Sequence, residues 1–173
     1  MKNIAFLFMS VVLFSSCENK KTTFHKSDIT ISKKAVEKVL NTWHKNAAEA
    51  NYEAYFNAMS KNGVFIGTDA SENWDINAFK KFSKPYFDAG KAWNFKPIER
   101  NIYINSDNEI AWFDELLNTW MGICRGSGVL KRVGDEWKIA HYVLSVTIPN
   151  ETIEKVIHIN KVKDSLFLSK ISQ

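Results

Sequence analysis

The first group of residues that suit acid–base catalysis consists of three side chains that are close together in the sequence. Asp69, Glu72 and Trp74 lie in the polar segment 67–74. A carboxylate beside an indole in a closed cavity has a raised pKa and can act as a general acid or base. The same residues suit a structural role, because Asp69 can bond within its own turn and Trp74 can pack against a core. The segment is predicted to border a pocket, and its catalytic role stays open.

A second group lies on two predicted strands. Trp112 and Asp114 alternate with Phe113 and Glu115, so each pair occupies its own face of one strand. We expect Trp112 and Asp114 to face the pocket, because an apolar residue continues their row. On the next strand, Arg125 either faces the cavity, where it would favour an anionic ligand, or forms a structural pair with Asp114. Both alternatives stay open.

The last predicted strand carries a histidine beside a tyrosine. His141 and Tyr142 project from opposite faces. A histidine with a near-neutral pKa is the most suitable proton-transfer group in the chain, although a single strand histidine is more often structural or exposed. The catalytic candidates are therefore Asp69, Asp114 and His141. Tyr142 and Trp93, which precedes the first long strand, are further pocket candidates.

Metal and cofactor chemistry has no support in the sequence. No CxxC or HExxH spacing is present, and the four histidines are scattered. No Gly-x-Ser-x-Gly segment indicates a serine nucleophile. Cys124, within an apolar strand, is expected to be a small core residue. We therefore expect no metal and no cofactor.

The N-terminus has the parts of an exported lipoprotein's leader. Lys2 supplies a positive charge, residues 4–14 are nearly all apolar, and Ser15 and Ser16 precede Cys17. The apolar stretch is too short for a bilayer span of about 20 residues but suits a signal peptide. The run ending at Cys17 resembles a bacterial lipobox, whose cysteine is acylated with chains such as palmitate. An ordinary cleaved signal peptide, or a short uncleaved anchor, is the alternative.

This interpretation divides the chain into four segments. Residues 1–16 are the signal peptide, 17–31 the lipidated Cys17 with a flexible tether, 32–162 one globular domain, and 163–173 a C-terminal tail. A domain of this size buries enough surface to need no disulfide. We expect the protein to be exported and anchored by lipid at the bacterial cell envelope, on the periplasmic face or the cell surface.

Charge and aromatic content narrow the range of partners. The formal net charge is +4, and the basic residues are spread along the chain. A nucleic-acid-binding protein concentrates such residues in a stripe, so no nucleic-acid partner is expected. Aromatic residues make up 13% of the chain and include six tryptophans. They suit an aromatic cavity, although a packed core would also use many of them.

Hydrophobic periodicity predicts helices first and long strands afterwards. Ser32 is a candidate N-cap for the first helix, and an extended segment at 28–31 is an alternative for the residues before it. Helices are predicted at 33–47, 52–59, 75–87 and 153–161, and strands at 64–67, 94–104, 109–117, 121–133 and 136–147. Gly126 and Gly128, on one face of a strand, indicate a sharp bend or the close approach of another segment. The order predicts an α+β fold with the sheet wrapped over the helices.

Five short segments in this order carry a resemblance to a known family. They are Gly67–Glu72 with Trp74, Phe79–Phe87, Arg125–Leu130, Trp137–Ala140 and Ile148–Glu151. With the order of elements, they make the chain similar to the SnoaL-like branch of the nuclear transport factor 2-like superfamily, over about residues 34–161. The resemblance implies a cone in which N-terminal helices pack inside a strongly curved antiparallel sheet.

The resemblance does not specify a reaction. The superfamily includes cyclases, isomerases, dehydratases, ligand binders and subunits without known chemistry. We expect a small, largely apolar ligand of unknown identity in an aromatic-lined cavity. One alternative is a cofactor-independent isomerase, cyclase or dehydratase that uses Asp69, Asp114 or His141. A non-catalytic structural homodimer is another, since these sheets often pair through their exposed face, and a homodimer is expected.

Overall fold

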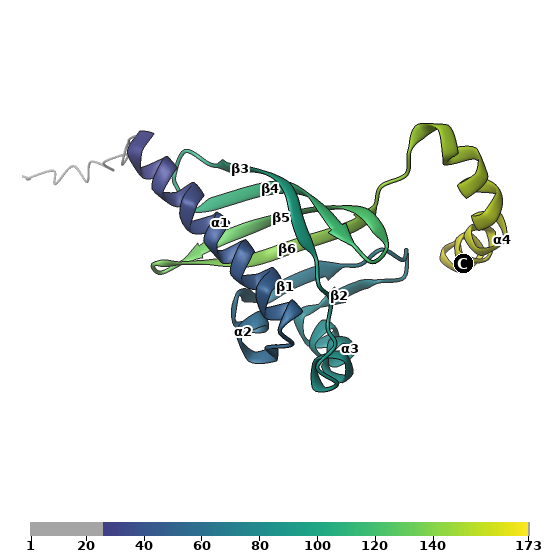
Figure 1. Ribbon diagram of the computed structural model, residues 1–173, viewed down its shortest axis with the longest axis horizontal. Coiled ribbons are helices and arrows are strands. Elements are labelled where there is room, and N and C mark those ends of the chain that lie inside the picture. The colour runs from purple at the N-terminus through teal and green to yellow at the C-terminus, as the bar shows by residue number, and fades with distance from the viewer. Residues whose placement is uncertain (1–25, 173) are drawn as a thin grey trace, which may run out of the picture.

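The computed structural model describes residues 26–172 (Figure 1). Its helices are α1 (Lys26–Ala48), α2 (Tyr52–Asn57), α3 (Ile76–Asp88) and α4 (Ile153–Ile171), with a 3₁₀ turn at Asn150–Thr152. Its strands are β1 (Met59–Ile66), β2 (Asn73–Asp75), β3 (Lys96–Ile104), β4 (Ile110–Thr119), β5 (Gly122–Val133) and β6 (Glu136–Val146). The predicted α+β class is confirmed. The signal peptide, Cys17 and most of the predicted tether lie outside the described residues.

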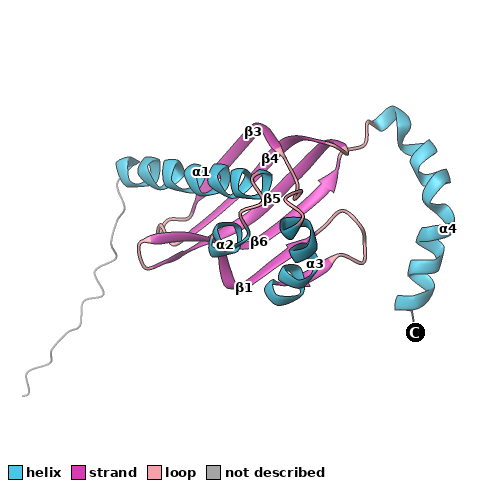
Figure 2. Cartoon of the chain, turned by 60° about the horizontal axis from the view of Figure 1, so that its bottom comes forward, coloured by secondary structure: helices cyan, strands magenta, loops and turns pink. Residues whose placement is uncertain are grey.

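The strands form one curved sheet in the order β2-β1-β6-β5-β4-β3. Neighbouring strands are antiparallel except β1 and β6, which run parallel. The helices α1, α2 and α3 lie against one face of this sheet, which we call the concave face (Figures 1 and 2). The outward side of the sheet is the convex face. Side chains alternate between these two faces along each strand, so every second residue of a strand faces the interior.

The first helix begins earlier than predicted. It starts at Lys26, so Ser32 lies inside the helix and is buried there, and it is not an N-cap. Residues 28–31 are helical, so neither a flexible tether nor an extended segment is correct for them. The segment 26–31 contains no glycine or proline to stop the helix, and Asp28 in its first turn favours the positive end of the helix dipole.

The chain between α2 and α3 is more regular than predicted. The second helix ends at Asn57 and β1 begins at Met59, ahead of the strand predicted at 64–67, with an irregularity in its pairing between Met59 and Val64. The polar segment before α3 contains β2, which pairs antiparallel with β1. A strand of three residues is too short for an alternating pattern to be detected. Its pairing places Trp74 opposite Phe65.

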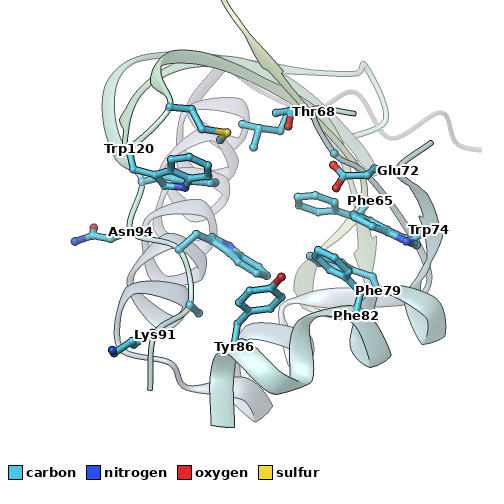
Figure 3. A pocket seen from close by; sticks show the side chains of 16 residues that line it. Phe65, Thr68, Glu72, Trp74, Phe79, Phe82, Tyr86, Lys91, Asn94 and Trp120 are labelled. Atoms are coloured by element: carbon cyan, nitrogen blue, oxygen red, sulfur yellow. The ribbon is translucent and has the colours of Figure 1, made fainter. Parts of the chain in front are cut away.

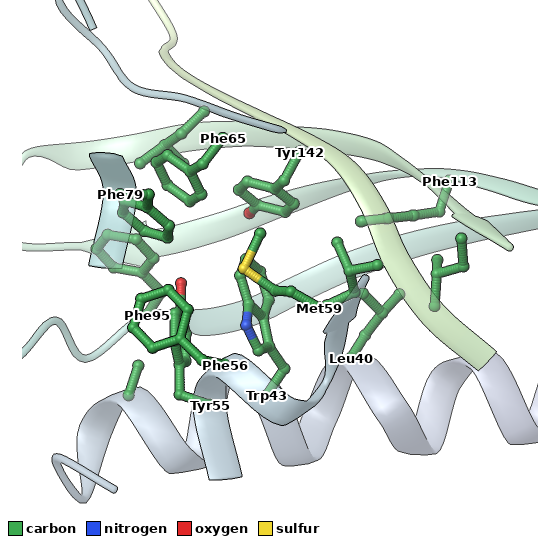
Figure 4. Packing of buried hydrophobic residues seen from close by; sticks show 14 of the residues in the cluster. Leu40, Trp43, Tyr55, Phe56, Met59, Phe65, Phe79, Phe95, Phe113 and Tyr142 are labelled. Atoms are coloured by element: carbon green, nitrogen blue, oxygen red, sulfur yellow. The ribbon is translucent and has the colours of Figure 1, made fainter. Parts of the chain in front are cut away.

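The core lies between α1, α2 and the concave face of the sheet (Figure 4). Its largest fully buried side chains include Trp43, Tyr55, Phe79 and Tyr142. A Cβ atom at Gly126 would collide with the Tyr142 hydroxyl. The close approach expected at this glycine is therefore present.

The last helix stands apart from the sheet (Figure 1). It runs to Ile171 instead of ending near Lys161, so the predicted C-terminal tail is helical almost to its end. None of its residues is buried. Among the described residues, none of the helices has both the length and the apolar character needed to span a bilayer.

Candidate functional site

A cavity of about 530 Å³ lies at one end of the concave face (Figure 3). It is bordered by the end of β1, the loop 67–72, β2, α3, the segment 91–95 and the turn between β4 and β5. Half of its lining residues are aromatic: Phe65, Trp74, Phe79, Phe82, Tyr86, Trp93, Phe95 and Trp120. A cavity of this size suits a small organic molecule.

Helical spacing builds one wall of this pocket. Phe79, Phe82 and Tyr86 recur at steps of three and four residues, so they share one face of α3. The ring centroids of Trp74 and Phe82 are 4.3 Å apart, and those of Phe65 and Phe79 are 4.0 Å apart, both in stacked geometry. Figure 3 shows Trp120 across the cavity from this stack. Each ring of this wall therefore packs on the next.

Of the pocket residues predicted from sequence, the structure brings together Glu72, Trp74 and Trp93. The Glu72 carboxylate also closes its own loop, because the Asp69 amide donates to it at 3.2 Å. Lys91, Asn94 and Thr68 are the other polar lining residues. Polar groups are therefore few in a mainly apolar site.

Asp69 lies outside the pocket lining and is fully exposed. Its carboxylate accepts hydrogen bonds from the Ser71 hydroxyl at 2.5 Å and the Ser71 amide at 2.9 Å. These bonds lower the pKa of Asp69, whereas general acid catalysis at neutral pH needs a raised one. The residue forms a turn, as in the structural alternative.

The face predicted for Trp112 and Asp114 is wrong. The buried row of β4 consists of odd-numbered residues, so Trp112 and Asp114 project from the convex face. Trp112 is 45% exposed and stacks on Tyr103 with ring centroids 5.7 Å apart. The Asn101 amide donates to the Asp114 carboxylate at 3.1 Å.

Arg125 and His141 are also on the convex face. Arg125 is exposed and takes part in none of the ion pairs found within residues 26–172, so its predicted pair with Asp114 is absent there. His141 is half-buried and lies opposite Val129 on β5. None of the three catalytic candidates lines the pocket.

Tyr142, the remaining candidate, is buried in a polar network behind the pocket. Its hydroxyl donates to Glu115 Oε1 at 3.0 Å, and His44 Nε2 lies 2.8 Å from the same oxygen. The Arg100 guanidinium donates to Glu115 Oε2 at 2.6 and 2.8 Å, and to the Asn41 side chain at 2.6 Å. Glu115 is only 1% exposed. This network joins α1, β3, β4 and β6.

The network stabilises a charged carboxylate in the core. Burial would raise the pKa of Glu115, but the hydrogen bond and charge of His44 and the guanidinium of Arg100 together lower it below its ordinary value. Burial and the adjacent Glu115 raise the pKa of Tyr142 well above its ordinary value, so its hydroxyl remains a donor. Each oxygen of the carboxylate is occupied by partners from the chain itself.

Sequence reasoning missed Glu115 and most of the pocket wall. Glu115 shares a row with Ala111, Phe113 and Leu117, and this apolar row could have identified the inward face. Phe82 and Tyr86 could have been found from the i, i+4 spacing of aromatic residues on α3. Within residues 26–172, no three His, Cys, Asp or Glu side chains are grouped as metal ligands.

Comparisons with solved structures show the same fold. An NTF2-like protein of unknown function from Pseudomonas putida KT2440 is 11% identical, with a TM-score of 0.60, over 71% of this chain and 92% of that chain. A protein from Novosphingobium aromaticivorans DSM 12444, provisionally named a scytalone dehydratase, is 10% identical with a TM-score of 0.61, over 72% of this chain and 89% of that chain. The association domain of C. elegans CaMKII is 15% identical with a TM-score of 0.57, over 69% of this chain and 99% of that chain. At these identities the likeness shows the fold alone.

The family itself is shown by sequence. No curated protein sequence matches the chain significantly. The profile of the SnoaL-like domain matches residues 36–149, which is well over half of the chain. This range contains the sheet, α2, α3 and every residue lining the cavity. The chain therefore belongs to the SnoaL-like family, within the nuclear transport factor 2-like superfamily.

Proposed function

We propose that this domain binds a small, largely apolar molecule in its aromatic pocket. The observation that carries the proposal is the lining of the cavity of about 530 Å³, in which stacked rings from β1, β2 and α3 face Trp120. Trp93 stacks on Phe79 of this wall. Ligand sites are typically apolar cavities with a few polar groups that orient the ligand. Glu72, Lys91 and Asn94 supply those groups here.

Binding is favoured over turnover by the position of the titratable groups. A cofactor-independent isomerase or dehydratase needs an acid or base that reaches the substrate. Asp69, Asp114 and His141 lie away from the cavity, and the Glu115 carboxylate is occupied by His44, Arg100 and Tyr142. Glu72 is the one carboxylate among the lining residues, and it accepts a hydrogen bond from the Asp69 amide of its own loop. The proposal is therefore a ligand-binding lipoprotein domain.

A thermal-shift screen with small apolar and aromatic compounds tests the binding. A ligand that binds only the folded protein raises its melting temperature with concentration. Trp120→Ala removes an 82% exposed pocket residue, so it should weaken the shift while the fold remains intact. Ile159→Ala, at an exposed position of α4 outside the pocket lining, is the control and should leave the shift unchanged. No stabilisation across broad chemical classes would contradict the proposal.

Export and lipid anchoring are the second part of the proposal. The support is the sequence before Cys17, whose apolar stretch and small residues suit signal cleavage and acylation. More than one acyl chain gives stable membrane attachment. A Cys17→Ser variant should leave the membrane fraction and lose labelling by radioactive palmitate. Unchanged fractionation together with an unlabelled wild-type chain would rule out the anchor.

A homodimer through the convex face is the third part. Tyr103, Trp112, Val129 and His141 are in register across four neighbouring strands, and the first two are exposed aromatic residues. Exposed apolar rows of this kind are typical of protein contact surfaces. Analytical ultracentrifugation should show a dimer that Trp112→Glu converts to a monomer. A wild-type monomer at every concentration would exclude this assembly.

A further inference from the structure

Two buried side chains in the core hold polar atoms without a hydrogen-bond acceptor. Trp43 on α1 is 1% exposed and Tyr55 on α2 is fully buried. Within residues 26–172, the Trp43 indole nitrogen has no hydrogen-bond partner. The Tyr55 hydroxyl has no acceptor for its proton, and only the Trp93 indole approaches it, as a donor. Their rings are stacked with centroids 4.9 Å apart, and Figure 4 shows them side by side in the core.

Unpaired polar groups of this kind are unusual in a folded protein. Buried polar groups are nearly always hydrogen-bonded, because an unpaired one loses its bonds to water and gains nothing in return. This chain does pair the nearby Tyr142 hydroxyl, which donates to Glu115 at 3.0 Å. The unpaired state of Trp43 and Tyr55 therefore needs its own explanation.

Both residues lie directly behind the inner wall of the pocket. Tyr55 contacts Trp93 and Phe79, with ring centroids 5.6 and 6.2 Å apart, and Trp43 contacts Phe65 at 6.4 Å. Trp93, Phe79 and Phe65 all line the cavity. One layer of aromatic rings thus separates the two unpaired groups from the pocket.

Trp93 is the ring of this layer whose backbone lies in neither a strand nor a helix, although its side chain packs on Tyr55, Phe79 and Phe87. It lies in the segment 91–95, which connects α3 and β3 without regular secondary structure. Residues 92–95 take part in none of the backbone hydrogen bonds found among described residues outside helices and strands. A displacement of Trp93 would free the Tyr55 hydroxyl from the indole and bring it to the cavity, and the Trp43 ring stacks directly on Tyr55. Phe65 and Phe79 are held in a strand and a helix.

Both unpaired groups are donors at neutral pH. An indole nitrogen can only donate a hydrogen bond. Burial raises the pKa of the Tyr55 hydroxyl well above its ordinary value, and the adjacent Trp93 indole opposes this without cancelling it. The hydroxyl therefore keeps its proton. A ligand group that satisfies both residues must be an acceptor.

We propose that the inner end of the pocket opens onto Trp43 and Tyr55, and that these donors bind the carbonyl oxygen of an otherwise apolar ligand. This inference rests on the proposed ligand-binding function and names the ligand class. A carbonyl oxygen accepts two hydrogen bonds. A carboxylate would carry a charge into an apolar wall where Arg100, the nearby buried cation of the network, is already bound to Glu115.

The test compares two ligands that differ only at the acceptor. Acetophenone and ethylbenzene share a ring and a two-carbon substituent, and only acetophenone has a carbonyl. Their dissociation constants for the purified full chain are measured by ligand-observed nuclear magnetic resonance titration. The readout is the Kd of ethylbenzene divided by the Kd of acetophenone. This ratio should fall about tenfold in Tyr55→Phe with Trp43→Phe, because two donors are lost and the aromatic rings remain.

Single variants and a control separate the outcomes. Tyr55→Phe alone should lower the ratio, and it serves by itself if Trp43→Phe does not fold. Tyr86→Phe removes a hydroxyl at the pocket rim and should leave the ratio unchanged. If both compounds bind and the ratio is the same in every variant, the carbonyl site is wrong while the pocket stands. If neither compound binds the wild-type chain, the proposed pocket function and this inference fall together.

Discussion

The ring nitrogen Nε2 of His44 lies 2.8 Å from the Glu115 carboxylate, and this contact ties the C-terminal part of α1 to the concave face of β4. Arg100 on β3 binds the other carboxylate oxygen. Side chains from α1, β3 and β4 thus meet at one buried charge. The protonation of Glu115 is consequently linked to folding.

Acid is expected to destabilise the protein through this carboxylate. Burial raises the pKa of Glu115, but His44 and Arg100 lower it below its ordinary value of 4.5. A lowered folded-state pKa means that the stabilisation is present above about pH 4.5 and is lost as the pH falls through the folded-state value. Chemical denaturation followed by circular dichroism from about pH 7 to about pH 3 measures this loss.

The variant Glu115→Gln isolates the contribution of this carboxylate to the stability of the protein. At neutral pH it should lower the free energy of unfolding by about 3 kcal/mol, because the Arg100 charge is left buried without its counter-charge. Its stability should also fall less steeply than wild type below about pH 5. Glu154→Gln is the control, since Glu154 is exposed on α4, takes part in none of the ion pairs found within residues 26–172, and should keep the wild-type profile. A Glu115→Gln chain as stable as wild type would refute the linkage.

Loss of the hydroxyl should change the free energy of unfolding differently at the two buried tyrosines, Tyr142 and Tyr55. Tyr142→Phe breaks a bond to a charged acceptor and should cost about 2 kcal/mol of unfolding free energy. Tyr55→Phe removes an unpaired hydroxyl and should be neutral or stabilising by about 1 kcal/mol. Equal losses in the two variants, measured by urea unfolding, would show that the Tyr55 hydroxyl has a partner.

A methyl group added at Gly126 should disturb the buried network. Its Cβ would collide with the Tyr142 hydroxyl and press on the Glu115 side chain. Gly126→Ala is expected to lower the free energy of unfolding by about 2 kcal/mol through overpacking. Ser127→Ala, at the next position but on the convex face, is the control and should stay within about 0.5 kcal/mol of wild type. Similar values for both variants would contradict the close packing.

The cap of α3 can be tested at Asp75, whose carboxylate accepts from the Asn77 and Ala78 amides, both at 2.8 Å. Asp75→Ala should lower the melting temperature and cost about 1 kcal/mol. It should also weaken ligand binding, because α3 carries one wall of the pocket. Glu154→Ala on α4, a helix without buried residues, should leave both properties unchanged. Unaltered stability in Asp75→Ala would mean that the cap is dispensable.

The sequence was sufficient for the order of elements because the periodicity of each long element is strong. The row Val36, Leu40, Trp43 and Ala47 has helical spacing, and all four side chains are buried. The boundaries were less predictable. Ser32 has the residue type of an N-cap, yet helical residues precede it, since nothing in 26–31 stops the helix.

The candidate site was predictable only in part. Trp74 and Trp93 stood out by residue type, and both line the pocket. The inward face of β4 was misassigned because each of its rows contains an aromatic residue and an acid, Trp112 with Asp114 and Phe113 with Glu115. The choice between the rows depends on partners that a single strand does not reveal. One of them is His44, which lies 71 residues before Glu115 in the chain.

The direction of α1 has a consequence for how the protein meets its surroundings. The helix begins at the end of the sheet that holds the turns after β3 and β5, whereas the pocket opens at the other end, beside the turn between β4 and β5 (Figure 1). An attachment through the N-terminus would therefore join the domain at the end of the sheet remote from the pocket, so the ligand entrance and the point of attachment lie at opposite ends of the sheet.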